Sequence, residues 1–417
     1  MFSTLRLLIT PLLCLVILTL GNGLITTYLS LRLHDLGSSS LSIGALTTFY
    51  YAGMTLAAFK TEKFIFRVGH IRAYAAFASL LAVTTMLHGI YINDIFWIIL
   101  RLVDGLAIGG LYVVIESWIL TSSNKENRGQ ILAVYMVALY LAQAGGQFLL
   151  NIGHIESFIP YAIATILASL SVIPLAMTKT DSPKFEEPST LNIKSLFKSS
   201  PSGIITCFIS GLILGNVYGL LPIYIADQDY SVNSLAWLMG ITILGGMALQ
   251  YPIGKLSDKI SRRTVMSALG IVTACISLII ALTSMYSFYF FCFSLFILGG
   301  ATFTLYPVSI SHTCDRLEPK DIIGATQGLL LAYGAGAMVG PVIAPFFIYA
   351  FNTTGLLIFF IICSLPLSVF LIWRKSQVEA PTDAEKQDFT AAPTTTPIVS
   401  ELNPRADEDN PQQAPSA

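Results

Sequence analysis

The chain has 417 residues, of which 54% are hydrophobic and 11% are charged, and its mean hydropathy is +0.71. A soluble protein carries about 25% charged residues, so this composition excludes an ordinary soluble enzyme, and the net charge of −1 gives no indication of a nucleic-acid partner. One apolar run follows another along the chain, which is typical of a protein with many membrane-spanning α-helices.

The chain contains twelve apolar runs that are each long enough to cross a membrane as a helix. About 20 residues at about 1.5 Å each cross roughly 30 Å of hydrocarbon, and helices are required because lipid cannot satisfy backbone hydrogen bonds. The first run has no small-residue cleavage site after it, so we expect it to be retained rather than removed as a signal peptide. The predicted spans are residues 8–32, 40–60, 71–91, 95–121, 129–152, 157–177, 203–226, 234–254, 264–284, 286–311, 322–350 and 354–373.

A polar stretch from Thr178 to Ser200 divides these spans into six and six. After Lys375 the composition changes to Pro, Thr, Ala, Glu and Asp, which bury too little apolar surface to form a core, so we expect this tail to be disordered. The predicted domains are an N-terminal six-helix bundle at 1–177, a cytoplasmic linker at 178–202, a C-terminal six-helix bundle at 203–375 and a disordered cytoplasmic tail at 376–417.

Lysine and arginine residues fall almost entirely on one side of the predicted spans. Of the 23 in the chain, all but Arg32 and Arg101 lie at the N-terminus, in alternate loops, in the linker or in the tail. Cytoplasmic loops carry such an excess of basic residues, so both termini are predicted to lie in the cytoplasm. We expect an integral protein of a bacterial inner membrane that works in the lipid bilayer as a monomer.

The two halves of the chain repeat one another weakly. Three short matches link corresponding spans at offsets of roughly 190 residues: Gly21-Asn22 with Gly215-Asn216, Gly109-Gly110 with Gly299-Gly300, and Tyr140 with Tyr333. No single match is strong in a glycine-rich chain, but three at nearly one period favour an internal duplication.

The fourth span, 95–121, carries charge where lipid would not tolerate it. Arg101 and Asp104 stand three residues apart, so they share a helix face and can pair, whereas Glu116 lies near the cytoplasmic end. Charges inside a membrane are costly and commonly mark a pathway, so Arg101, Asp104 and Glu116 are candidates for proton and substrate coupling. The alternative is that the pair only keeps two buried charges tolerable and that Glu116 is solvated at the membrane surface.

Two motifs resemble those of a known family. The loop YPIGKLSDKISRRT after the eighth span is similar to Gly-x-x-x-Asp-Arg/Lys-x-Gly-Arg/Lys-Arg/Lys, with Ser261 where a glycine is usual, and RLVDGLAIGG in the fourth span resembles Arg-x-x-x-Gly-x-x-x-Gly. With twelve spans, six plus six, the chain resembles the major facilitator superfamily over about residues 8–373, and VVIESWILTSSNKENRGQILAVYMV resembles its YcaD-like branch. The resemblance implies an all-α membrane protein with twelve transmembrane helices in two pseudo-symmetric six-helix bundles.

The resemblance also implies a gate on the cytoplasmic side, in which Glu116 forms a latch with Arg128 and with loop arginines such as Arg67. The first-half loop KTEKFIFRVGHIR has Phe66 where an acid is usual, so its acidic partner is missing or replaced by Glu62. Basic residues at these places are equally explained by the charge asymmetry of membrane proteins. The predicted gate residues are Arg67, Arg128, Gly254, Asp258, Arg262 and Arg263.

A central cavity is predicted to be lined by amide and tyrosine side chains, because spans seven to twelve contain no charged residue away from their ends. Asn22 and Asn216 occupy equivalent places in the two halves, and Gln143 lies one turn from Gln147. The alternative for such residues is hydrogen bonding between packed helices. The candidate lining residues are Asn22, Tyr112, Gln143, Gln147, Asn216, Tyr218, Tyr306 and Tyr333.

These features predict a secondary active transporter of a small molecule that works by alternating access. The chain has no phosphate-binding loop, no HExxH and no GxSxG, so we expect no enzyme activity, no cofactor and no metal, and the five histidines, all near span ends, are expected at the interface. An ion gradient must then supply the energy, and the available carboxyls favour a proton over sodium. The alternatives are a uniporter and a non-transporting membrane sensor or scaffold that binds a partner through its tail.

Overall fold

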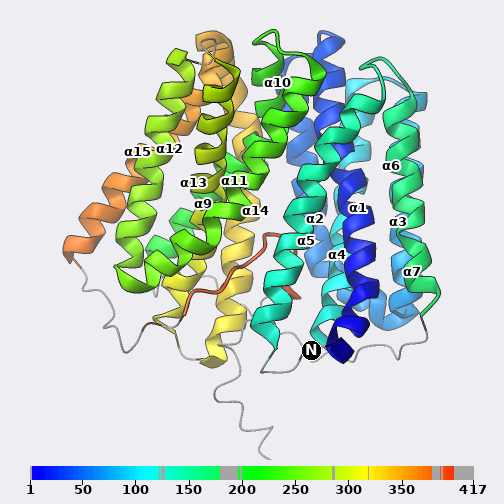
Figure 1. The fold of residues 1–417 in the computed structure, drawn as a ribbon, viewed down its shortest axis with the longest axis horizontal. Coiled ribbons are helices and arrows are strands. Elements are labelled where there is room, and N and C mark those ends of the chain that lie inside the picture. The colour runs from blue at the N-terminus through cyan, green and yellow to red at the C-terminus, as the bar shows by residue number, and fades with distance from the viewer. Residues whose placement is uncertain are drawn as a thin grey trace, which may run out of the picture.

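The computed structural model describes residues 2–121, 123, 127–178, 196–197, 200–283, 287–317, 319–377, 386 and 388–398, and most of the expected linker therefore lies outside it. Every regular element of the described residues is a helix (Figure 1). The first half contains α1(Phe2–Asp35), α2(Ser40–Val68), α3(His70–Ile90), α4(Asp94–Thr121), α5(Arg128–Phe148), η1(Leu149–Ile152), α6(Ile159–Leu170) and α7(Val172–Ala176). The second half contains α9(Pro201–Gly219), α10(Leu221–Ala226), α11(Val232–Lys259), α12(Arg262–Thr283), α13(Phe288–Cys314), α14(Pro319–Phe351), η2(Asn352–Thr354) and α15(Gly355–Gln377).

Ten helical runs in the described residues are long and apolar enough to cross a membrane. The expected number was twelve, and two features account for the difference. Helix α2 is not among the ten, because its first two-thirds are rich in Ser, Thr, Tyr and Gly. Helices α14 and α15 are joined through η2 into one helical run of 57 residues, Asp321–Gln377. The number twelve therefore stays a prediction.

The outer faces of the helices are apolar and exposed, as the side chains of Val83, Leu282 and Val369 illustrate. Charged side chains such as Arg101 and Glu116 are instead buried inside the protein. A soluble protein hides large apolar surfaces, so this distribution is that of a protein whose outer surface meets lipid.

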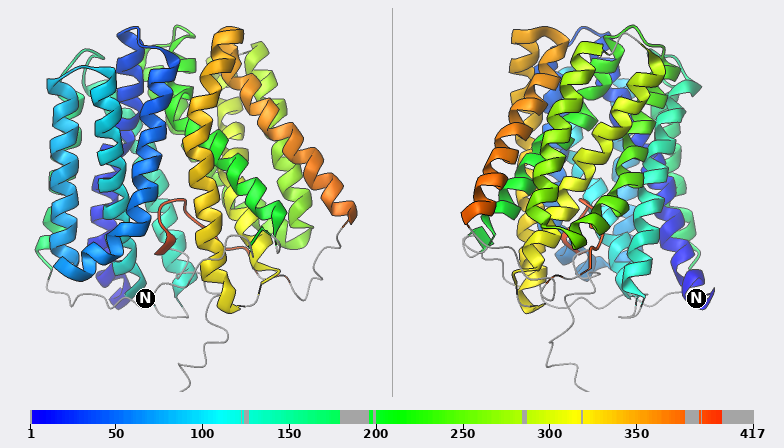
Figure 2. Two further views of the ribbon diagram at one scale, coloured as in Figure 1. Left: turned by 180° about the vertical axis from the view of Figure 1, so that it is seen from behind. Right: turned by 60° about the vertical axis from the view of Figure 1, so that its left-hand side comes forward.

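The helices of each half pack mainly against one another, and the halves meet through α2 against α14 and α5 against α11 (Figure 2). The halves also share a local signal. Ser39 caps α2 by accepting a hydrogen bond from the Ser42 amide, and Ser231 caps α11 in the same way through Ser234. A serine at the N-cap satisfies an amide that the helix leaves free, and its recurrence after 192 residues supports a duplicated origin.

Close helix packing depends on glycines in the corresponding helices of the two halves. A Cβ on Gly105 of α4 would meet the Tyr50 carbonyl of α2, and a Cβ on Gly299 of α13 would meet the Thr242 carbonyl of α11. Small residues let helix backbones approach inside membranes, where van der Waals contact replaces the hydrophobic effect between helices. The corresponding pairs α2–α4 and α11–α13 are thus held in the same way.

The described part of the C-terminal tail departs from the disorder expected for residues 376–417. Residues 388–398 run between the two groups of helices at the end of the molecule that carries the N-terminus (Figure 2). Phe389 and Ile398 are buried, with 7% and 2% of their surface exposed. The stretch FTAAPTTTPI carries no charge, so its burial incurs no cost for desolvating an ion.

We expect Gly105→Ala to lower the free energy of unfolding by about 1–3 kcal/mol, because the added methyl forces α2 and α4 apart. Gly129→Ala is the matched control, since a Cβ there meets nothing within 4 Å. Thermal unfolding in detergent should place the midpoint of Gly105→Ala clearly below that of the parent and leave Gly129→Ala at or above it. Equal midpoints for the two variants would contradict the close approach of α2 and α4.

Candidate functional site

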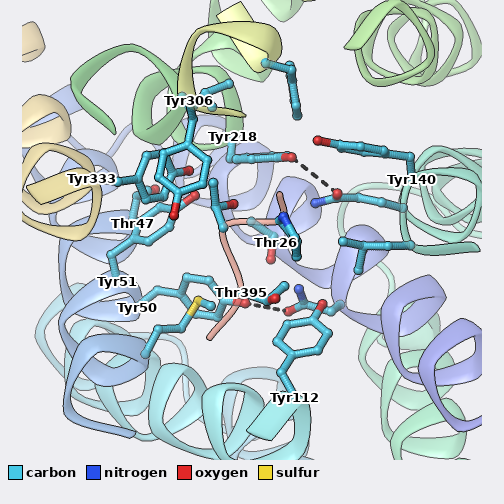
Figure 3. Close-up of a pocket in the computed structure, with 18 of the residues that line it drawn as sticks. Thr26, Thr47, Tyr50, Tyr51, Tyr112, Tyr140, Tyr218, Tyr306, Tyr333 and Thr395 are labelled. Atoms are coloured by element: carbon cyan, nitrogen blue, oxygen red, sulfur yellow. Dashed lines mark hydrogen bonds between the residues drawn. The ribbon is translucent and has the colours of Figure 1, made fainter. Parts of the chain in front are cut away.

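A cavity lies between the two groups of helices, and about 70 Å³ of it is open to the centre of a water molecule (Figure 3). Its walls come from α1, α2, α4 and α5 on one side and from α9, α13 and α14 on the other. Of the eight residues predicted to line a cavity, the structure places six on this wall: Asn22, Tyr112, Gln143, Tyr218, Tyr306 and Tyr333.

The wall is mostly aromatic, and its rings pack across the boundary between the halves. Tyr333 of α14 lies 6.4 Å from Tyr51 of α2 and 5.1 Å from Tyr306 of α13, measured between ring centroids. Tyr218 of α9 donates a hydrogen bond of 3.2 Å to Gln143 of α5. The residues that line the cavity carry no formal charge. The cavity therefore offers ring faces, hydroxyls and amides to whatever it holds.

Two of the predicted lining residues lie elsewhere. Gln147 is buried between α1 and α5, where it accepts a hydrogen bond of 2.8 Å from Thr27 and donates one of 3.1 Å to the Gly23 carbonyl. Asn216 is fully buried and donates 2.8 Å to the Leu212 carbonyl within its own helix. Gln147 follows the helix-packing alternative, because it bonds from α5 to α1, whereas Asn216 lies against Gly340 of α14 without a hydrogen bond to that helix among the described residues.

Arg101 and Asp104 form the buried pair that the sequence predicted. The Arg101 Nη1 and Asp104 Oδ2 atoms are 3.5 Å apart, and each residue has 2% of its surface exposed. The guanidinium carbon of Arg101 lies 4.0 Å from the centre of the Tyr50 ring, a cation–π contact that helps a buried cation. Neither charge reaches the cavity, because the Tyr50 ring lies between Arg101 and the cavity.

Two residues of α3 complete this cluster and were missed by sequence reasoning. Thr84 donates a hydrogen bond to Asp104 Oδ1, and the His88 Nε2 atom lies 3.8 Å from Asp104 Oδ2. His88 is fully buried, and His70 and His312 are 3% exposed, so three of the five histidines that were expected at the interface are buried inside the protein. The His88 Nδ1 atom lies 2.7 Å from the Thr84 carbonyl, which only accepts, so neutral His88 turns an unprotonated Nε2 toward Asp104. The sequence gave one indication of this contribution from α3: Thr84 and His88 are one helical turn apart, so they lie on the same face of the helix.

The cluster is joined to the cavity by two side chains. Tyr50, which the Arg101 guanidinium covers, donates a hydrogen bond of 3.2 Å to Asn22 on the cavity wall. Thr26, also on the wall, accepts a long hydrogen bond of 3.5 Å from Arg101 Nη2. A change of charge at Asp104 or Arg101 therefore alters the interactions of Tyr50 and Thr26, which both line the cavity and contact Arg101 directly.

Glu116 lies near the other end of α4 and is fully buried. The expected latch with Arg128 or Arg67 is not what holds it. Its carboxylate accepts a hydrogen bond of 2.5 Å from Tyr135 of α5 and further hydrogen bonds from Thr395 and Thr396 of the tail. Arg67 is exposed near the end of α2, and Arg128 begins α5. Among the described residues, hydroxyl groups rather than an arginine balance this carboxylate.

The second-half residues that were predicted to form a gate lie close together where α11 ends and α12 begins. Asp258 Oδ1 and Arg262 Nη1 are 3.2 Å apart, and Arg262 also binds Asp315 beyond α13 through contacts of 2.5 and 3.2 Å. Arg263 donates a hydrogen bond of 3.4 Å to the Arg374 carbonyl of α15. The start of α12 is thus tied to the end of α11, to the end of α13 and to α15 by contacts of its two arginines, and charged hydrogen bonds are about twice as strong as neutral ones.

Comparison with known proteins places these features in a family. A family model described as Major Facilitator Superfamily matches residues 12–231 and again 203–406. The uncharacterized MFS-type transporter YcaD of Escherichia coli (strain K12 / DH10B) is 30% identical over 371 residues, which are 88% of this chain and 95% of that protein. The protein of the same name from Salmonella enteritidis PT4 is 29% identical over 375 residues, or 89% and 96%.

Solved structures have the same fold at low identity. The nucleoside transporter NupG superposes with a TM-score of 0.70 at 15% identity, covering 90% of this chain and 99% of the other. A bacterial homologue of the human lysosomal transporter Spinster, in an inward-facing and occupied conformation, gives 0.70 at 13% identity, covering 93% and 98%. These likenesses show the fold.

We expect Asp104→Asn to lower the free energy of unfolding by about 3–5 kcal/mol, because it leaves the Arg101 guanidinium buried without its counter-charge. The double change Arg101→Gln with Asp104→Asn should recover most of this loss. Asp94→Asn, at the start of the same helix, is the control, since Asp94 bonds only the hydroxyl of Ser38 among the described residues. Unfolding in detergent measures all three. A double variant no more stable than Asp104→Asn would contradict the coupling of the pair.

Proposed function

This chain belongs to the Major Facilitator Superfamily and is an integral membrane transporter, and we propose that it carries a small molecule by proton-coupled alternating access. In this proposal, twelve transmembrane helices form two six-helix bundles, and both termini lie in the cytoplasm of a bacterial cell, with the protein in the inner membrane. One observation carries the proposal: a buried Arg–Asp pair lies one residue behind the wall of a cavity between the two halves.

Alternating access requires that the halves meet on one side of the cavity and separate on the other. At the end far from the N-terminus, His34 Nε2 and Asp227 Oδ1 are 2.9 Å apart and link α1 to the end of α10. Thr48 of α2 donates a hydrogen bond of 2.8 Å to the Met338 carbonyl of α14. At the other end, the tail segment lies between the groups of helices (Figure 2). These contacts support the proposal of a carrier that is closed to the outside and has its cavity on the cytoplasmic side.

The proposed proton site is Asp104 together with His88. The carboxylate and the imidazole nitrogen are 3.8 Å apart, which is too far for a direct hydrogen bond but close enough for the charge of one group to act on the other. The arrival of a proton weakens the attraction between Asp104 and Arg101, which frees the guanidinium to interact more strongly with Tyr50 and Thr26 on the cavity wall. Proton binding and substrate binding would thereby be linked.

The cavity favours an uncharged polar substrate with a flat or ring-shaped face. Its lining residues carry no formal charge, so an ionic substrate would lose its hydration without a counter-ion. Tyrosine rings from both halves suit a stacked ring, and Asn22 and Gln143 can hydrogen-bond hydroxyl or amide groups. Nucleosides are one class with this chemistry and belong in a test panel.

A uniporter remains the competing hypothesis, in which the Arg101–Asp104 pair is only structural. A sensor or scaffold is favoured by a different observation, namely the tail lying in the cavity. Thermal-shift screening of the purified protein against uncharged hydroxylated compounds, nucleosides included, selects a ligand because binding stabilises the folded state. Proton movement in proteoliposomes when that ligand is added, followed with a pH-sensitive dye, separates the proton-coupled carrier from the other two hypotheses, and uptake of the ligand separates the uniporter from the sensor or scaffold.

For the ligand so selected, we expect Asp104→Asn to abolish accumulation driven by a pH gradient while exchange across the membrane continues, because exchange needs no net proton movement. Asp94→Asn should retain both activities. Radiolabelled uptake and counterflow in proteoliposomes measure them. A folded Arg101→Gln with Asp104→Asn variant that still concentrates the ligand against its gradient would end the assignment of the proton to this site.

A further inference from the structure

The tail segment 388–398 is the one part of the described chain outside the helical halves that reaches the cavity. Its residues Ala392, Pro393, Thr394 and Thr395 belong to the cavity lining, and Figure 3 shows this stretch passing between Tyr50 and the tyrosines of the second half. From Phe389 to Ile398 the segment carries no charge, although charged residues precede and follow it. An uncharged stretch of this kind can be buried inside the protein at little cost, whereas its charged flanks cannot.

One end of the segment is held at the end of α11. The Phe389 ring lies against Gly254, where a Cβ would collide with it, and Phe389 is 7% exposed. The Phe389 amide donates a hydrogen bond of 3.1 Å to Asp258 Oδ2. The contact between Lys255 and Asp388, at 3.6 Å, is exposed and therefore contributes little. Gly254 and Asp258 thus provide a pocket and an acceptor for the tail.

The other end of the segment is held at α4. Thr395 donates a hydrogen bond to one oxygen of Glu116 and Thr396 donates to the other, while Tyr135 donates to the first at 2.5 Å. Thr396 and Ile398 are buried, with 3% and 2% exposed. A buried carboxylate needs donors, and two of the three come from the tail. The tail is therefore part of what keeps Glu116 satisfied inside the protein.

With the segment in place, little of the cavity remains. Only about 70 Å³ is open to the centres of water molecules. Pockets for small ligands occupy about 300–1,000 Å³. A ring-bearing molecule and the tail therefore exclude each other from the cavity.

We propose that residues 388–398 are an intramolecular ligand of the central cavity, bound at Gly254–Asp258 and at Glu116, which must leave before a substrate can bind from the cytoplasmic side. That the cavity binds a substrate rests on the proposed function, whereas binding of the segment in the cavity does not. Because release strips Glu116 of two donors, a ligand that offers hydroxyl donors to Glu116, or a proton on Glu116 itself, favours release. The segment thereby competes with the substrate for the central cavity.

The first test is hydrogen exchange of the full-length protein in nanodiscs, read by mass spectrometry on the peptide covering residues 388–398. The parent should exchange this segment at least tenfold more slowly than the same peptide exchanges when it is free in solution. Thr395→Val with Thr396→Val, which keeps the side-chain shape and removes both donors, should raise the segment's exchange rate on the order of tenfold. The matched control is Thr390→Val in the same segment, since Thr390 does not donate to Glu116, and it should exchange like the parent.

The second test measures access to the cavity without any substrate. In full-length protein carrying Thr26→Cys, the rate of labelling by N-ethylmaleimide at that position, above the background of the native cysteines, reports on the open cavity. The double valine variant should label on the order of tenfold faster, and Thr390→Val should not. Phe389→Ala, which empties the pocket at Gly254, should act like the double valine variant and provides the test if that variant does not fold.

Fast exchange of residues 388–398 in the parent, or equal labelling of Thr26→Cys in all tail variants, would overturn the proposal. Neither measurement uses transport, so a failure of the tail to bind is distinguished from a failure of the chain to transport. Slow exchange with absent transport would leave the intramolecular ligand in place and refute only the proposed carrier activity.

Discussion

A charge buried between helices must be balanced by partners inside the protein, and α4 meets this requirement in two ways. At Asp104 the partners are a guanidinium and a threonine hydroxyl, both within the first half of the chain. At Glu116 the partners are hydroxyls, two of which arrive from the tail. The first arrangement is held by the helices themselves, while the second depends on a segment that can be replaced by another donor.

The cavity lies between these two buried clusters, and the charged side chains of neither cluster line its wall. Since both charges of the Arg101–Asp104 pair are behind Tyr50 and Thr26, the wall itself is uncharged and aromatic. The pair still acts on the wall, because a cation on a tyrosine face responds to the charge beside it. This separation allows a protein to hold a proton close to a neutral substrate without placing an ion in the substrate's path.

The end of α11 serves two purposes in one place. Asp258 pairs with Arg262 and thereby joins the helix ends, and its second oxygen accepts the Phe389 amide of the tail. Gly254, which belongs to the loop motif of the family, leaves the space that the Phe389 ring fills. Any movement that closes the helices at this end must therefore displace the tail, so that the motif and the segment are mechanically linked.

Sequence alone determined the parts of this protein that depend on local pattern. Apolar runs required membrane helices, and the i, i+3 spacing of Arg101 and Asp104 placed both on one helix face, where the structure pairs them. It also found six residues of the polar wall of the cavity, because a tyrosine or amide in an otherwise apolar helix has few favourable places to lie, but it missed others, among them Tyr50, Tyr51 and Thr26.

Tertiary structure decided what depends on the rotation of one helix against another and on contacts distant in the chain. Gln147 and Asn216 turn toward neighbouring helices rather than into the cavity, and no pattern in their own helices reveals which side is open. Thr84 and His88 join Asp104 only because α3 packs on α4. The tail composition predicted disorder, yet its charge-free stretch is buried, because Glu116 supplies acceptors and Gly254 supplies space some 280 and 135 residues away in the chain.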